Sequence, residues 1–204
     1  MIARAKDKAP RLPPAVPPYD EAIKRTLERM MGGVDVPPLA LFRTIAHNPH
    51  LLDKLRSTGS YLLNFGTLDP ADREIVILRT CARCGSEYEW GVHVAVFARS
   101  AGLTDEQVAT TVSGDRSHQA WSDRQALLVA LVDELHDTAT VSDGLWERLE
   151  SEWSPAQLVE LVALVGQYHT IAYFTNAFAV RLEDFAAPYP GQPTASSASP
   201  SVVR

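Results

Sequence analysis

Helix start signals recur along this 204-residue chain, and they constrain its fold more than any other feature. Several segments place a hydroxyl side chain three residues before a glutamine, a spacing that satisfies free amide groups at the start of a helix. These pairs are Thr104 with Gln107, Ser122 with Gln125, and Ser154 with Gln157. Asp69 before Pro70 suits the cap and first position of another helix. The alternation typical of strands joined by hairpin turns is missing from the sequence. The sequence therefore predicts an all-α fold.

Further helices are expected at residues 19–31, 38–47, 50–64 and 142–152. Glycines mark several helix ends, because glycine adopts the left-handed conformation of a helix terminus at little cost. These glycines are Gly32-Gly33, Gly102 and Gly114. Within residues 70–100, Gly85 followed by Ser86 indicates that one helix stops and a second begins, with Ser86 as its cap and Glu89 completing a capping box.

The composition divides the chain into one folded domain and two flanks. Residues 1–18 and 188–204 are rich in proline or in small polar residues and are expected to be flexible segments without chemistry. Residues 19–187 are expected to form a single helical domain. Two cysteines three residues apart cannot join distant segments, so burial has to hold this domain together.

Charge and hydropathy exclude several classes of partner. The chain has 19 basic and 25 acidic residues and a net charge of −6, which argues against nucleic acid and against an anionic membrane surface. Polar residues interrupt the apolar stretch from Leu158 to Val180, which favours a buried helix over a membrane span. The first residues have no continuous apolar run, so we expect a cytoplasmic protein.

Cys81-Ala-Arg-Cys84 suggests thiol redox chemistry, but its position argues against that reading. A redox thiol is usually activated at the start of a helix, where amide groups stabilise the thiolate. Here the pair falls in the last turn of the helix that precedes Gly85, where carbonyl groups favour the protonated thiol. Two packed core thiols are the alternative that we favour. Metal binding is not expected, because no second pair of cysteine or histidine ligands follows at close spacing.

Glu89 and His93 form the second candidate pair, because four residues bring a carboxylate and an imidazole onto one helical face. A chain reversal at Gly85 would bring Glu74 of the preceding helix toward His93. Two carboxylates near an imidazole can hold an acid and a base in one site. We therefore propose Glu74, Glu89 and His93 as catalytic residues. Capping and core packing are the structural alternatives for this pair.

Neighbouring residues supply candidate substrate contacts. Ser86, Tyr88 and Trp90 lie on the same short segment and could form polar and aromatic walls, although core packing explains the two aromatic residues equally well. His169 could reach the same pocket, but a core histidine bonded to a backbone carbonyl is the more common arrangement. No role is assigned to the remaining histidines, which are His47, His50, His118 and His136.

These residues resemble the carboxymuconolactone decarboxylase family, which includes an alkyl hydroperoxidase D branch. The similarity runs from about residue 38 to Asp184. Its strongest parts are Arg73-Glu-Ile-Val-Ile-Leu-Arg79, Cys84-Gly-Ser-Glu-Tyr-Glu-Trp-Gly-Val-His93, Ala101-Gly-Leu-Thr104 and Gln157-Leu-Val-Glu-Leu-Val162. The resemblance implies an alkyl hydroperoxidase D-like helical bundle that assembles into homo-oligomers, such as trimers or hexamers, with the site near a subunit boundary.

The two branches differ in the residues that precede the histidine. In the peroxidase branch, a glutamate and a Cys-x-x-Cys pair precede it at positions that correspond here to Glu74, Ser86 and Glu89, so both redox thiols are missing from their usual places. Decarboxylase sequences share the glutamate four residues before the histidine. They also tend to have a basic residue just before it, where this chain has Gly91 and Val92.

The resemblance and the residues together predict a lyase that is similar to carboxymuconolactone decarboxylase. We expect proton transfer on a small carboxylated or lactone substrate without a metal or organic cofactor. Two alternatives remain open. One is a thiol peroxidase with peroxiredoxin activity that uses Cys81 and Cys84, and the other is a non-catalytic oligomeric binding protein.

Overall fold

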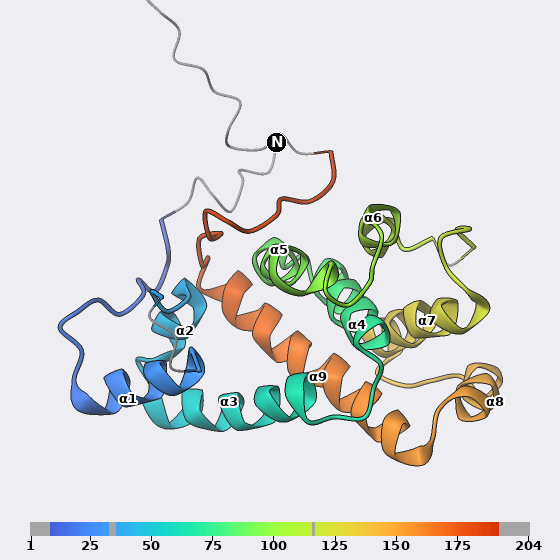
Figure 1. Ribbon diagram of the computed structural model, residues 1–204, viewed down its shortest axis with the longest axis horizontal. Coiled ribbons are helices and arrows are strands. Elements are labelled where there is room, and N and C mark those ends of the chain that lie inside the picture. Colours follow the sequence, from blue (N-terminus) through green and yellow to red (C-terminus); the bar gives the residue numbers. More distant parts are fainter. Residues whose placement is uncertain (1–8, 33–35, 116, 192–204) are drawn as a thin grey trace, which may run out of the picture.

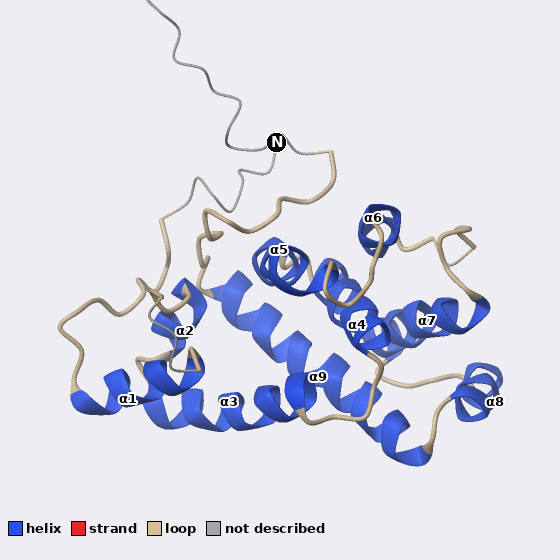
Figure 2. Cartoon of the chain, in the orientation of Figure 1, coloured by secondary structure: helices blue, strands red, loops and turns tan. Residues whose placement is uncertain are grey.

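The computed structural model describes residues 9–32, 36–115 and 117–191, and the regular secondary structure of these residues is entirely helical. Figure 2 shows helices joined by loops, without a strand in this part of the chain. The elements in order are α1 (Glu21–Met30), α2 (Ala40–Ile45), α3 (Pro49–Asn64), α4 (Pro70–Arg83), α5 (Glu87–His93), the π-helical turn η2 (Val94–Ala98), α6 (Asp105–Ser113), α7 (Asp123–Thr138), α8 (Asp143–Glu152) and α9 (Pro155–Ala177). The all-α prediction is confirmed.

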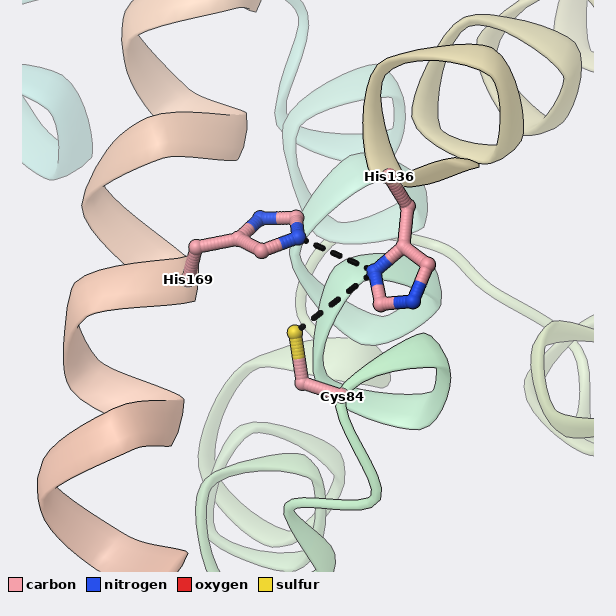
Figure 3. A group of neighbouring side chains, drawn as sticks. All are labelled: Cys84, His136 and His169. Atoms are coloured by element: carbon pink, nitrogen blue, oxygen red, sulfur yellow. Dashed lines mark hydrogen bonds between the residues drawn. The ribbon is translucent and has the colours of Figure 1, made fainter. Parts of the chain in front are cut away.

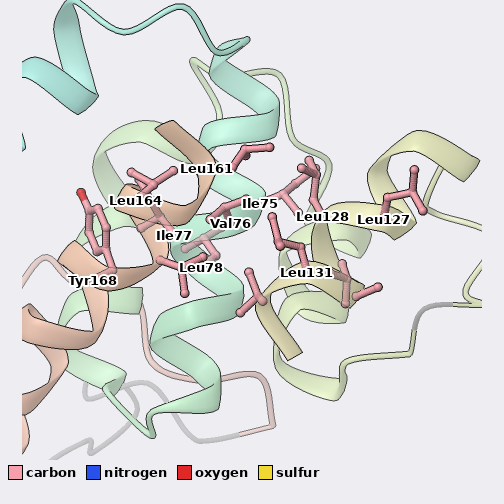
Figure 4. Packing of buried hydrophobic residues seen from close by; sticks show 14 of the residues in the cluster. Ile75, Val76, Ile77, Leu78, Leu127, Leu128, Leu131, Leu161, Leu164 and Tyr168 are labelled. Atoms are coloured by element: carbon pink, nitrogen blue, oxygen red, sulfur yellow. The ribbon is translucent and has the colours of Figure 1, made fainter. Parts of the chain in front are cut away.

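Helix α4 lies at the centre of the molecule and contacts α5, α6, α7 and α9 (Figure 1). Its apolar residues Ile75 to Leu78 are fully buried, so the helix is covered on every side. Figure 4 shows these residues between the side chains of α7 and those of α9. A second apolar cluster joins α1, α2 and α3 to α5 and to the end of α9. The central position of α4 brings its polar side chains within reach of several other helices.

The chain reverses between α4 and α5, as the Gly85-Ser86 pair predicts. Gly85 has a φ of +64°, and its amide donates to the carbonyl of Ala82. The amide of Ser86 donates to the carbonyl of Cys81, which completes the two hydrogen bonds of a Schellman motif. This motif ends α4 and allows α5 to fold back beside it.

Local capping accounts for most of the remaining helix boundaries. The capping boxes predicted at Thr104, Ser122 and Ser154 are present with both hydrogen bonds. Asp69 caps α4 with Pro70 at the first position. Gly114 ends α6 with a φ of +70°. Gly32 follows α1 with a φ of +63°, whereas Gly33 lies outside the described residues.

One predicted cap is wrong. Ser86 does precede α5, but its side chain makes no capping hydrogen bond, so it forms no capping box with Glu89. The Ser86 hydroxyl is fully buried and instead pairs with the hydroxyl of Thr175 on α9 at 2.7 Å. Because α9 supplies this partner, Glu89 has no capping role and its carboxylate extends toward His93.

Parts of the two flanks contact the helices. The amide of Arg11 donates to the carbonyl of Phe178, and the amide of Ala15 donates to the carbonyl of Arg43. On the other side, the amide of Tyr189 donates to the carboxylate of Glu87. The rest of the predicted flexible flanks, residues 1–8 and 192–204, lies outside the described residues.

Helix α9 is the longest of the described helices. Among the described residues, no helix has both the length and the apolar character that crossing a membrane requires. The interpretation of Leu158 to Val180 as a buried helix agrees with this result, since α9 contributes Leu161, Leu164 and Val165 to the core.

Candidate functional site

The site is centred on His93, the last residue of α5, and two other helices supply its partners. Glu74 of α4 accepts a hydrogen bond from Nδ1 of His93, with a distance of 2.8 Å to its Oε2. On the other edge of the ring, Nε2 lies 3.0 Å from the hydroxyl of Tyr168 on α9. The imidazole is therefore held at both nitrogens between a carboxylate and a phenol.

Burial makes these contacts strong. The side chain of His93 is 3% exposed, that of Glu74 is 0% exposed, and Tyr168 is also buried. Charges interact more strongly where water is excluded, so the ion pair between Glu74 and His93 is worth more here than at a surface. The chain reversal at Gly85 creates this pair, because it lays α5 beside α4.

Arg73 fixes the carboxylate of Glu74 from its other side. The Nε of Arg73 donates to Oε1 of Glu74 at 3.1 Å, and its Nη1 donates to the carbonyl of Leu63 at 2.9 Å. The buried carboxylate thus has a cationic partner on each oxygen, which compensates for its loss of hydration.

Glu89 approaches His93 less closely than Glu74 does. Its Oε1 lies 3.5 Å from Nε2 of His93, which is an ion-pair distance rather than a good hydrogen bond. Both carboxylates lie near the histidine, as the sequence predicts, but Glu74 makes the shorter contact. The other oxygen of Glu89, Oε2, is buried and has no hydrogen-bond partner among the described residues. A buried polar atom without a partner is a candidate contact for a ligand.

The surroundings set the charge of His93. Burial by itself lowers the pKa of the imidazole, but the charge and hydrogen bond of Glu74, together with the nearby carboxylate of Glu89, outweigh it and raise the pKa to about 9. His93 is accordingly an imidazolium at neutral pH. Burial raises the pKa of Tyr168 well above its ordinary value, with further contributions from Glu89 and Glu74. Tyr168 is a neutral phenol, and its oxygen accepts the proton on Nε2.

The π-helical turn η2 begins directly after His93. Such turns are rare and occur frequently at functional sites. Phe97 in this turn is partly buried, and its ring centroid lies 4.9 Å from that of His93. Val96 beside it is half exposed. The side of His93 that faces η2 is therefore covered by a side chain that also reaches the surface.

The structure does not bring Ser86, Tyr88 or Trp90 to the histidine. Ser86 bonds to α9, as described above. The hydroxyl of Tyr88 donates to Glu183 and accepts from the amide of Leu41. The indole of Trp90 donates to the hydroxyl of Thr111. All three are buried and bonded within the core. For Tyr88 and Trp90 this is the core packing that the sequence analysis gave as the alternative to substrate contact.

The two cysteines lie where the helix-end argument places them. Cys81 is fully buried in the last turn of α4, and Cys84 is the partly buried residue that caps its end. Both are free thiols. Burial, followed by the charge of Glu89, raises the pKa of Cys81 well above its usual range. Burial also raises the pKa of Cys84 to about 11, against the opposing effect of the Arg83 charge. Neither environment favours thiolate.

Tyr168 and Phe97 were missed by sequence reasoning. Tyr168 stands in the apolar run of α9, where its spacing resembles that of an ordinary core residue. Phe97 follows His93 by four residues, so the two are neighbours on one helical face. Its only signal in the sequence is this spacing from a candidate catalytic histidine. His169, the other candidate on α9, does not join this site, and its Nδ1 donates to the carbonyl of Val165.

Comparisons with known proteins bear on the family and the fold. The family model that matches the chain is the carboxymuconolactone decarboxylase family, over residues 49–133. This segment contains Glu74, Glu89 and His93. The chain is therefore similar to this family over that segment. Tyr168 lies outside the matched segment. No protein of curated function matches the chain.

Solved structures share the fold at low sequence identity. An uncharacterized peroxidase-related protein from Silicibacter sp. is 16% identical, with a TM-score of 0.72 over 91% of this chain and 98% of that one. An alkylhydroperoxidase AhpD core protein from Ralstonia eutropha is 17% identical, with a TM-score of 0.67 over 86% and 95%. The debrominase Bmp8 in complex with 2,3,4-tribromopyrrole is 13% identical, with a TM-score of 0.68 over 85% and 92%. These similarities establish an alkyl hydroperoxidase D-like fold.

Proposed function

We propose that this protein is a carboxymuconolactone decarboxylase-like enzyme that transfers protons to a small carboxylated or lactone substrate without an organic cofactor. The observation that carries the proposal is the state of His93. A buried imidazolium, fixed by Glu74 at Nδ1 and facing Tyr168 at Nε2, is a proton donor whose orientation is set before a substrate arrives.

The proposed reaction is a decarboxylation. The bond between the carboxylate carbon and the rest of the substrate breaks, carbon dioxide leaves, and the electron pair moves into the conjugated carbonyl system of the lactone. The positive charge of His93 stabilises the enolate that forms, and its Nε2 gives a proton to the carbon that lost the carboxylate. Water returns a proton to His93, so one proton is consumed for each carbon dioxide released.

Glu74 and Glu89 have different roles in this proposal. Glu74 is a positioning residue, since it holds the Nδ1 proton and sustains the charge of the ring. Glu89 provides the polar contact for the substrate, because its Oε2 is buried beside His93 and has no described partner. A hydroxyl or protonated oxygen of the substrate would satisfy that atom.

Access to the buried ring requires a side chain to move. We assign this role to Phe97, which contacts His93 and is partly exposed on the π-helical turn. Side-chain rotation of a partly exposed residue is fast, so a path opened by Phe97 would not limit turnover.

The direct test is an assay of the purified full-length protein with unsaturated lactone acids. Carbon dioxide release and the loss of ultraviolet absorbance by the conjugated lactone are both measured. We expect His93→Gln to lower kcat by a factor of about 100 or more, the usual range for losing a general acid. His50→Gln changes the same residue type at an exposed position and should leave kcat unchanged. Equal activity of the two variants would contradict the role of His93.

The same purified protein also tests the two alternative functions, a thiol peroxidase and a non-catalytic binding protein. A thiol peroxidase would consume peroxide in the presence of a dithiol, would link Cys81 to Cys84, and would lose activity in Cys84→Ser but not in His50→Gln. A binding protein would show no turnover, and His93→Gln would leave all of its ligand affinities unchanged. Burial of Cys81 and the raised pKa values of both thiols argue against the peroxidase.

A further inference from the structure

A second cluster of reactive side chains lies apart from the His93 site. Cys84 at the end of α4, His136 near the end of α7 and His169 in α9 converge where these three helices meet (Figure 3). Tyr168 and His169 are consecutive, but Tyr168 bonds to His93 whereas His169 faces His136. Sequence reasoning assigned His136 no role, because it stands near a predicted helix end.

The three potential ligand atoms are as close together as a metal site requires. Nδ1 of His136 lies 3.0 Å from Nε2 of His169 and 3.9 Å from Sγ of Cys84, and all three atoms lie within 4.8 Å of one another. In a tetrahedral zinc site, two nitrogens are about 3.3 Å apart, and a nitrogen and a sulfur about 3.6 Å apart, as bonds of about 2.0 and 2.3 Å dictate. Small side-chain rotations would produce this geometry.

Hydrogen bonding orients His169 as a ligand. A carbonyl oxygen can only accept, so the 2.9 Å contact between Nδ1 of His169 and the carbonyl of Val165 places the proton on Nδ1. Nε2 then presents its lone pair to the cluster. Ligand histidines are commonly fixed in this way, with the second nitrogen donating to a backbone carbonyl.

His136 presents its Nδ1 to both of the other proposed ligand residues. Nδ1 of His136 can donate to His169 in the metal-free cluster, and it would exchange that proton for a metal ion. Asp133 and Asp137 are the nearby anionic groups, and both form ion pairs with Arg83, so the charge of Arg83 is balanced.

We propose that Cys84, His136 and His169 form a binding site for zinc, with a water molecule as the fourth ligand. One thiolate and two imidazoles suit this borderline-soft ion, and three protein ligands with an open position are typical of zinc sites that bind a water or substrate. All three residues are partly exposed, so an ion and a water molecule can reach them. This site uses none of the residues of the proposed decarboxylation.

The test is metal titration of the purified full-length protein after treatment with a chelator. We expect one zinc ion per chain by mass spectrometry of metals. We also expect cobalt to give the visible absorption of a tetrahedral ion together with a thiolate charge-transfer band. The thiol must lose its proton on binding, so zinc should release protons when it binds and should bind more tightly as the pH rises.

Variants locate the ion. Cys84→Ser, His136→Gln and His169→Gln should each weaken zinc binding by more than about 100-fold, beyond the loss typical of outer-shell changes. Cys84→Ser should also abolish the cobalt charge-transfer band. Cys81→Ala and His50→Gln are the matched controls and should bind zinc as the wild type does. Circular dichroism checks that each variant is folded.

Two results would overturn the proposal. The first is that the wild-type protein binds no stoichiometric zinc and that its cobalt complex shows no thiolate charge-transfer band. This result does not depend on whether the ligand variants fold. The other is binding that survives in all three ligand variants, because the ion would then lie elsewhere on the chain.

Discussion

At the residue scale, the main feature of the protein is a buried histidine, His93, that is protonated at neutral pH. Burial favours the neutral form of His93, and the carboxylate of Glu74 reverses that preference. Glu74 is the closer carboxylate: its Oε2 lies 2.8 Å from Nδ1 of His93, whereas Oε1 of Glu89 lies 3.5 Å from Nε2. The spacing of Glu89 and His93 in the sequence suggested their proximity, but it could not reveal that Glu74 is the stronger partner.

Replacing Glu74 should shift the pH dependence of the reaction. Glu74→Gln removes the charge that keeps His93 protonated, so burial then lowers the pKa of the ring. We expect kcat of the wild type to decline only above about pH 9, and kcat of the variant to decline already at lower pH. The measurement is a pH profile of kcat for both proteins. Glu147→Gln at an exposed position is the control, and identical profiles for wild type and Glu74→Gln would rule out this role.

The proton on His93 should also contribute to the free energy of unfolding. The pKa of His93 rises from its ordinary value of 6.5 to about 9 on folding, so the folded state retains a proton that the unfolded state loses. The stabilisation is fully present below pH 6.5 and is lost as the pH rises through 9. A shift of this size corresponds to about 3 kcal/mol.

Denaturant unfolding between about pH 6 and pH 10, which brackets the two pKa values, checks this stability prediction. The free energy of unfolding of the wild type should fall more steeply with rising pH than that of His93→Gln. Both proteins contain the same two cysteines, so thiol titration cancels in the comparison. Parallel curves for the two proteins would show that His93 does not hold the proton.

At the element scale, the short helix α5 depends on close backbone packing. Gly91 lies against the C-terminal segment, where the amide of Ala187 donates to the carbonyl of Gly91. A Cβ atom at position 91 would lie 2.2 Å from the carbonyl oxygen of Ala187. Val92 beside it is buried as well. A basic residue, which decarboxylase sequences tend to have just before the histidine, would therefore clash at position 91 of this chain.

This packing predicts opposite effects for two glycine substitutions. Gly91→Ala should destabilise the protein by about 2 kcal/mol or more, because the new methyl group meets backbone atoms that cannot rotate away. Gly166→Ala lies in α9 with nothing near its added Cβ and should stabilise by up to about 1 kcal/mol. Thermal or denaturant unfolding of both variants tests the pair, and a neutral Gly91→Ala would show that the C-terminal segment is not held against α5.

At the scale of the whole molecule, α9 ties the two apolar clusters together and also presents an apolar surface. Leu161 and Leu164 pack in the first cluster, and Ile171 packs in the second. Val159 and Tyr173 on the same helix are exposed by more than half of their surface. Burying such side chains between copies of the chain would be favourable.

We therefore predict a homo-oligomer, as the family resemblance implies. Size-exclusion chromatography with light scattering should give three or six times the chain mass of 22.4 kDa. The mass should stay constant on dilution into the micromolar range, because an association that buries a large apolar surface persists there. A particle of one chain mass at all concentrations would contradict the prediction.

The sequence by itself determined where most helices begin and end, because caps and glycine stops act over only a few residues. It determined in the same way that the chain reverses at Gly85, which was enough to predict that Glu74 approaches His93. Only the tertiary structure decided which side chains meet across long separations. Tyr168 joins His93 from 75 residues away, and His136 joins Cys84 from 52 residues away. The hydroxyl of Ser86 likewise bonds to Thr175 instead of capping α5. The packing of α9 against α4 and α5 sets all of these contacts, and no local sequence pattern encodes them.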